Sequence, residues 1–277
     1  MKHIAKILLL SVIAITTLHA QKATLKWKTD TLLRVPESVL FDAEHKILYV
    51  ANIDGKPDGK DGAGFISKVS LDGKIEKLKW VEGLDAPKGM GIFKGKLYVS
   101  DITNVAIIDI ASGKILKKIE VENAKFLNDI TVDKKGTVYI SDSGAGKIYA
   151  LNGDKIELYF ENPELKGPNG LLAEANDLYI LDFSNGNNFK LSADKKFTKF
   201  GVSSQGADGV VTFGNDGYLV SNWNGEVYHM NAKGEVTKIL DTKDQKISAA
   251  DIEYDAKSKL LFVPTFFSNS VMAYEVK

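Results

Sequence analysis

The chain has 277 residues, no cysteine, and as many basic as acidic side chains, 36 Lys and Arg against 36 Asp and Glu. Without cysteine it has no disulfide and no thiolate metal site, and the balanced charge gives no reason to expect a nucleic acid or an anionic membrane surface as partner. Arg34 is the only arginine, which nearly excludes bidentate guanidinium clamps on phosphate or carboxylate groups.

Residues 1–20 predict a secretory signal peptide. A basic start is followed by the apolar run 7–15 and a small-residue exit at Ala20. The run is too short and wrongly flanked for a membrane span, and no cysteine follows it to carry a lipid. We therefore expect a periplasmic or extracellular protein with no membrane span after cleavage, in which residues 21–277 form a single domain.

The rest of the chain repeats one phrase six times: a small or polar pair, an alternating apolar run, a turn and a second apolar run. In chain order the copies occupy residues 36–39 with 48–52, 87–90 with 97–101, 127–130 with 138–142, 168–171 with 178–182, 207–210 with 219–222, and 249–252 with 261–264. Each copy continues into further alternating strands around a Gly turn. Four short strands per repeat of about 40–45 residues are typical of propeller blades.

The two ends of the chain predict how the ring closes. The sixth copy has only one further strand, 270–276, and a spare strand at 24–32 precedes the first copy. The spare strand can complete the last blade and leave no open sheet edge. The sequence therefore predicts an all-β fold, a six-bladed β-propeller with four-stranded antiparallel blades, closed by the N-terminal strand.

Two positions of the repeat stand out. The residue that closes the second strand is Asp or Asn in five copies, which favours a local cap or turn role; these residues are Asn52, Asp101, Asp142, Asp182 and Asn222. The second residue of the phrase varies instead, and it opens the innermost strand, so its side chains are expected to converge on one end of the channel. Around the ring it is Glu37, Lys88, Asn128, Asn169, Asp208 and Ala250, with Asp129 and Asp251 one residue further along.

Oxygen donors at this position suit Ca²⁺, Mg²⁺ or Mn²⁺. Zinc with nitrogen ligands is nearly excluded, because His45 and His229 are the only histidines after residue 20. The competing interpretation is that Asn or Asp before Gly is an ordinary turn residue at a strand entrance.

The phrases Pro36-Glu37, Phe126 to Asp129, Pro168 to Leu171 and Ala207 to Gly209 resemble the channel motifs of the gluconolactonase, senescence-marker-protein and regucalcin-like family. The resemblance runs through all of residues 21–277 in blade order. It implies a six-bladed propeller with one divalent cation, most often Ca²⁺, that hydrolyses lactones or related esters. It further implies that Glu37, Asn169 and Asp208 are metal ligands, that Asn128 is a ligand or substrate contact, and that Asp208 is the general base.

Two residues depart from that pattern. Phe126 replaces the arginine that family members carry two residues before the blade-three Asn, which favours a more apolar substrate than a sugar-acid lactone. Lys88 lies across the ring from Asp208, where it is expected to pair with Asp208 in competition with a cation, to hold a substrate carboxylate, or to turn to solvent. We assign Lys88, Phe126, Asp129 and Asp251 to substrate contacts.

Two functions remain open at this point. The first is an exported, metal-dependent hydrolase of lactones or small esters, which fits the absence of a G-x-S-x-G elbow and of cysteine. The second is a non-catalytic propeller that binds a small molecule, glycan or protein partner at the same face.

Two further features have an expected place but no assigned function. Trp223, Phe266 and Phe267 either line the mouth or pack between blades. The insertion Asp54–Gly64 is expected to be a mobile loop, at most a lid.

Overall fold

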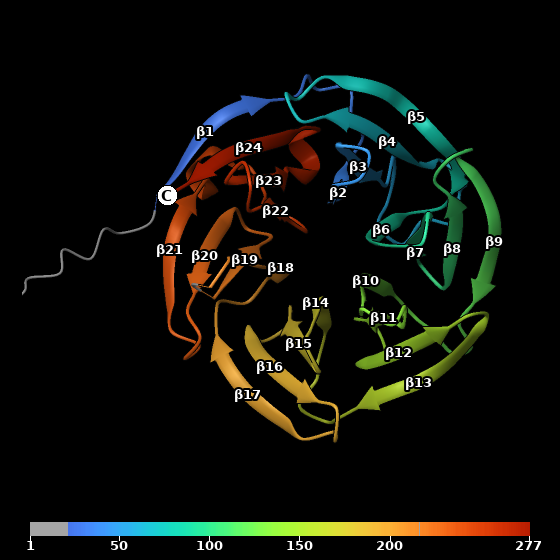
Figure 1. The fold of residues 1–277 in the computed structure, drawn as a ribbon, viewed down its shortest axis with the longest axis vertical. Helices are drawn as coiled ribbons and strands as arrows, with labels where there is room; N and C mark the ends of the chain where they lie inside the picture. The colour runs from blue at the N-terminus through green and yellow to red at the C-terminus, as the bar shows by residue number, and fades with distance from the viewer. Residues whose placement is uncertain (1–21, 216) are drawn as a thin grey trace, which may run out of the picture.

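The computed structural model describes residues 22–215 and 217–277, so the predicted signal peptide lies outside the described residues. These residues form six four-stranded antiparallel sheets arranged as a ring around a central channel (Figure 1), which confirms the predicted propeller. Within this part of the chain, no helix has the length and apolar character needed to cross a membrane.

The strands follow the chain from the channel outward in each blade. The first three blades are β2 (Pro36–Asp42), β3 (Ile47–Asn52), β4 (Gly64–Ser70) and β5 (Ile75–Leu84); β6 (Pro87–Phe93), β7 (Lys96–Asp101), β8 (Asn104–Asp109) and β9 (Lys114–Glu120); and β10 (Leu127–Val132), β11 (Val138–Asp142), β12 (Lys147–Asn152) and β13 (Lys155–Glu161). The next two are β14 (Pro168–Glu174), β15 (Asp177–Asp182), β16 (Asn187–Ser192) and β17 (Phe197–Val202); and β18 (Ala207–Thr212), β19 (Tyr218–Asn222), β20 (Glu226–Met230) and β21 (Val236–Asp241).

The sixth blade contains both ends of the described chain. Its strands β22 (Glu253–Asp255), β23 (Leu260–Pro264) and β24 (Val271–Val276) are completed by β1 (Ala23–Lys28), which pairs with β24 from Ala23↔Val276 to Lys28↔Met272. Figure 1 shows β1 on the outside of this blade. The predicted closure is therefore confirmed, and short 3₁₀ turns at Lys243–Gln245 (η1) and Phe266–Ser268 (η2) are the helical elements among the described residues.

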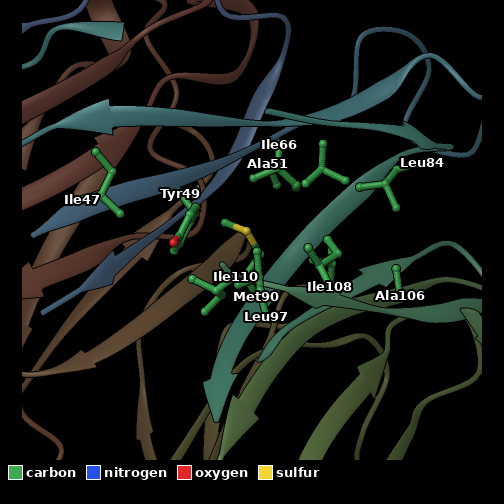
Figure 2. Packing of buried hydrophobic residues seen from close by; sticks show 12 residues of the cluster. Ile47, Tyr49, Ala51, Ile66, Leu84, Met90, Leu97, Ala106, Ile108 and Ile110 are labelled. Carbon is green, nitrogen blue, oxygen red and sulfur yellow. The ribbon is translucent and has the colours of Figure 1, made fainter. Parts of the chain in front are cut away.

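The apolar core lies between neighbouring blades. Between the first two, Tyr49 and Ile66 of β3 and β4 pack against Met90, Leu97 and Ile108 of β6, β7 and β8 (Figure 2). Each of these side chains is at least nine-tenths buried. The alternation of the strands explains this packing, because both faces of an inner strand meet a neighbouring blade.

The Asp or Asn that closes the second strand anchors the segment that enters the same blade. The carboxylate of Asp142 accepts hydrogen bonds from the backbone N–H groups of Lys125 and Phe126, each at 2.9 Å, and from those of Gly144 and Ala145. Asp101 accepts in the same way from the N–H groups of Asp85 and Ala86. The predicted cap role of this position is confirmed.

A β-bulge opens each of the first five inner strands. The pairing register shifts between Pro36 and Ser38 in the first blade, and at the equivalent place in the next four. The second residue of the repeated phrase lies inside every one of these bulges. A bulge releases a residue from regular pairing and re-aims its side chain, so the fold turns this position toward the channel.

Candidate functional site

A cavity of about 340 Å³ opens at the end of the channel where the inner strands begin. We call it the upper cavity. Its polar lining is made by bulge residues of five blades, Glu37, Lys88, Asn128, Asn169 and Asp208, with Ser143 and Ser184. The structure thus brings together all four predicted metal ligands and the two residues that depart from the family pattern, Lys88 and Phe126.

Two carboxylates lie in the upper cavity almost out of contact with solvent. Glu37 is 5% exposed and its Oε2 is buried without a hydrogen-bond partner, while Asp208 is 2% exposed and accepts a hydrogen bond from Nδ2 of Asn169 at 3.0 Å. Burial, followed by the charges of Asp208 and Asp251, raises the pKa of Glu37 well above its usual range. Burial, followed by the charges of Asp251 and Asp129, likewise raises the pKa of Asp208.

This donor set fits a hard divalent cation. Among the residues that the structure describes, no group of three or more His, Asp, Glu or Cys side chains is arranged to hold a metal. The predicted set is of another kind, two carboxylates and two amides, which supplies the oxygen ligands that Ca²⁺ and Mg²⁺ take. The unpartnered Oε2 of Glu37 is the observation that favours it, because an uncompensated carboxylate is costly to bury.

Asn128 is linked to the fourth blade through Ser143 of its own blade. Its Nδ2 donates to Oγ of Ser143 at 3.2 Å, and this hydroxyl donates to the carbonyl of Pro168 at 2.7 Å. Pro168 opens the strand that carries Asn169. These hydrogen bonds therefore link Asn128 in the third blade to the residue that precedes Asn169 in the fourth.

Lys88 does not pair with Asp208. Its ammonium donates to the carbonyl oxygens of Pro57 and Ala86, each at 2.9 Å, and lies 4.4 Å from the centre of the Phe126 ring. Burial lowers the pKa of Lys88 to about 8, against the opposing charges of Glu37, Asp101 and Asp58. Two of the three expected alternatives are therefore wrong: the ammonium contacts carbonyls and not Asp208, and the side chain does not turn to solvent because it is 1% exposed.

An aromatic wall completes the upper cavity, and we define it as Phe126, Phe183, Trp223, Phe266 and Phe267. The rings of Trp223, Phe266 and Phe267 meet edge to face, with centroids 4.8–6.0 Å apart. Phe266 is buried and also packs against Ile53 and Ala250, whereas Phe267 is 65% exposed. Both expected roles for these aromatic residues are therefore present.

Several lining residues were not predicted from the sequence. Ile53, Ser143 and Phe183 occupy the place of Trp223 in their own blades, directly after the closing Asp or Asn. The repeat could have predicted them, because a residue expected to line the mouth in one blade, Trp223, indicates that the equivalent residues of the other blades line it too. Pro57 also lines the cavity, and its loop is tied to the second blade by hydrogen bonds from Gly62 N–H to Asp85 and from Lys60 to Thr103.

Asp129 and Asp251 are not in the upper cavity. They line a second cavity of about 330 Å³ toward the other end of the channel, the lower cavity, together with Glu253. Asp129 accepts from the N–H groups of Leu171 and Ile130, each at 2.6 Å, and Asp251 accepts from Oγ of Ser38 at 2.6 Å. Their expected place at the channel mouth is therefore wrong, because the structure shows both joining neighbouring blades, while their assignment as substrate contacts stays a prediction.

The glycines that follow Asn169 and Asp208 have a packing role and not a turn role. Both lie within strands, β14 and β18. A Cβ at Gly170 would lie 2.0 Å from the carbonyl oxygen of Asp208, and one at Gly209 would lie 2.5 Å from Oδ1 of Asp251. The turn interpretation of these Asn-Gly and Asp-Gly pairs is therefore wrong, since glycine is needed for the close approach of neighbouring inner strands.

No model of a protein family matches the sequence, and no curated protein matches it either. Solved structures do. A catalytically inactive His-to-Ala variant of virginiamycin B lyase from Staphylococcus aureus, solved with quinupristin, is 12% identical with a TM-score of 0.64, covering 92% of this chain and 98% of its own.

Two further structures are similar. A streptogramin B lyase is 9% identical with a TM-score of 0.67, over 93% of this chain and 97% of its own. A chain of a nidogen/laminin complex is 16% identical with a TM-score of 0.65, over 79% and 84%. At these identities the likeness establishes the six-bladed fold, which enzymes and binding proteins share.

Proposed function

We propose that the protein is a divalent-metal-dependent hydrolase of lactones or small esters with an apolar body, and that the upper cavity is its active site. The observation that carries this proposal is the buried, unpartnered Oε2 of Glu37 beside Asp208 and Asn169. The resemblance of the bulge residues to the gluconolactonase and regucalcin-like family supports it. Export to the periplasm or the exterior is part of the same proposal.

The side chains of the cavity have distinct tasks in this reaction. Glu37, Asn169, Asp208 and Asn128 would hold the cation, which when bound would polarise the acyl carbonyl and acidify a water molecule. The carboxylate of Asp208, held in the cavity by the hydrogen bond from Asn169, would accept the proton of the attacking water. The aromatic wall would bind the apolar part of the substrate and exclude bulk water.

The wall also indicates the substrate preference. Phe126 occupies the place where a polar anchor for a sugar-acid lactone is expected, and Phe183 and Trp223 add further apolar surface. Dihydrocoumarin, an aromatic lactone, should therefore be a better substrate than δ-gluconolactone. Among the similar structures, virginiamycin B lyase is an enzyme and the nidogen/laminin chain is part of a complex, so the fold accommodates either kind of function.

A direct assay tests the proposal. The wild-type protein should hydrolyse dihydrocoumarin in the presence of Ca²⁺, Mg²⁺ or Mn²⁺ and lose the activity with chelator. Asp208→Asn should lower kcat by about 10²–10⁴, the contribution of a positioned general base. Glu253→Gln is the matched control, a carboxylate of the same channel in the lower cavity, and should keep the activity.

The opposite result favours the second candidate, a non-catalytic propeller that binds a small molecule, glycan or protein partner at this mouth. Phe267, 65% exposed at the cavity, is the observation in its favour. Wild-type protein that turns over neither lactone nor phenyl acetate with any of these cations would overturn the hydrolase, as would full activity in Asp208→Asn.

A further inference from the structure

The ammonium of Lys88 is a buried cation that forms no ion pair with a carboxylate of the described residues. It lines the upper cavity, is 1% exposed, and donates to two neutral acceptors, the carbonyls of Pro57 and Ala86. Within residues 22–215 and 217–277, no ion pair joins it to a carboxylate. An ammonium has three donors, so one remains beyond these two hydrogen bonds.

Such a group needs an explanation, because buried lysines are rare unless they are paired. The contact with the Phe126 ring compensates part of the charge. Glu37 lines the same cavity, but its Oε2 has no hydrogen-bond partner, so it accepts no hydrogen bond from Lys88. A ligand in the cavity could therefore supply a hydrogen-bond acceptor to the third N–H of Lys88.

The position of Lys88 is fixed from two sides. Ala86 and the adjacent Asp85 are anchored through their N–H groups to the carboxylate of Asp101. Pro57 belongs to the 54–64 loop, which is bound to the second blade through Gly62 and Lys60. An ammonium held this way loses little side-chain freedom when it binds an anion, because that freedom is already lost in the folded protein.

The net charge of the side chains around the cavity favours a ligand with one negative charge. With a divalent cation held by Glu37 and Asp208, Lys88 leaves one net positive charge among these side chains. A single carboxylate neutralises it, and hydrogen bonds between ionised groups are the strong ones.

We propose that Lys88 and the aromatic wall together make the upper cavity a site for small monocarboxylates with an apolar ring. The ammonium binds the carboxylate and the rings of Phe183, Trp223 and Phe266 bind the body of the ligand. A cavity of about 340 Å³ lies at the small end of the usual range for ligand pockets, which limits the ligand to one or two rings.

This inference rests on the proposed function only in taking the upper cavity as the site. Hydrolysis of a lactone adds water across the acyl C–O bond: the hydroxyl goes to the acyl carbon, a proton goes to the alkoxy oxygen, and the new carboxylic acid releases its proton. The ring-opened product of an aromatic lactone is then a carboxylate with a ring, a member of the inferred ligand class. Lys88 would thus be a product-positioning residue.

Isothermal titration calorimetry with 3-(2-hydroxyphenyl)propionate and its neutral amide tests the inference without any turnover. In saturating Ca²⁺ the wild-type protein should bind the carboxylate at least about tenfold more tightly than the amide, since a hydrogen bond to a charged group contributes about 1.5–3 kcal/mol. Lys88→Met should reduce this preference to less than about threefold. Lys195→Met is the matched control and should keep it, because Lys195 also contacts a carbonyl and a ring, those of Tyr159, but lies outside the cavity.

Equal affinity for carboxylate and amide, no binding of either, or a preference that survives in Lys88→Met would each overturn the inference. The wild-type comparison requires no variant, so misfolding of Lys88→Met would leave the test intact. A wild-type preference for the carboxylate in a protein that hydrolyses no lactone would overturn the hydrolase and support Lys88 as part of a carboxylate-binding propeller.

Discussion

The two ends of the channel contain similar buried side chains, but the hydrogen bonds of these side chains differ. The upper and lower cavities are nearly equal in volume, about 340 and 330 Å³, and both contain buried carboxylates. In the lower cavity, both oxygens of Asp129 and both oxygens of Glu253 accept backbone hydrogen bonds. In the upper cavity, Oε2 of Glu37 has no hydrogen-bond partner.

This difference separates structural from functional acidic groups. A carboxylate that accepts from backbone N–H groups, one of them in a neighbouring blade, holds the two blades together, and its removal leaves buried donors unpaired. A carboxylate that is buried and unpartnered costs stability in the empty protein, and is explained by what it binds. The same residue types therefore have opposite predicted effects when they are removed from the two cavities.

The largest predicted effect on stability is in the lower cavity. Asp129→Ala would leave the N–H groups of Ile130 and Leu171 buried without acceptors, and should lower the free energy of unfolding by about 2–5 kcal/mol. Chemical denaturation with chelator present measures this. Glu37→Gln is the paired variant and should leave the stability unchanged or raise it, because it removes a repelled, unpartnered charge.

Equal losses in Asp129→Ala and Glu37→Gln would contradict the distinction between the two cavities. A loss confined to Glu37→Gln would reverse it.

A change of pH is expected to have a smaller effect on the free energy of unfolding. Burial raises the pKa of Asp251 and that of Glu253 to about 7, so the folded protein holds protons that the unfolded chain releases near pH 4. This stabilisation is complete below about pH 4 and is lost as the pH rises to about 7. In chelator, the free energy of unfolding should therefore fall between these pH values, and Asp251→Asn should make the fall shallower. A free energy of unfolding that rises over this range would show that these groups are ionised in the folded protein.

Most of the fold could be predicted from the sequence. The number of blades, the closing strand at 24–32 and the anchoring role of residues such as Asp142 were all readable from the repeat, because the same local chemistry recurs about every 40 residues. The placement of Glu37, Asn169 and Asp208 in one cavity was predicted for the same reason.

The position of Asp129 and the contacts of Lys88 could not be predicted from the repeat. Asp129 follows Asn128 by one residue, and successive side chains of a strand point in different directions, so the two belong to different cavities although they are adjacent in sequence. One acceptor of Lys88, the carbonyl of Pro57, lies in a loop 31 residues earlier. That loop occurs in a single blade, so the repeat offers no equivalent from which to predict its position.

The central claim is that the upper cavity holds a divalent cation between Glu37 and Asp208, and a thermal melt with and without Ca²⁺ tests it most directly. A cation that binds only the folded protein stabilises it by about 2.7 kcal/mol at a hundred times its Kd, which raises Tm by about 5–10 °C for a domain of this size. We predict this rise in the wild-type protein and in Glu253→Gln, and none in Asp208→Ala. A Tm that responds to no divalent cation, or a rise that persists in Asp208→Ala, would contradict the claim.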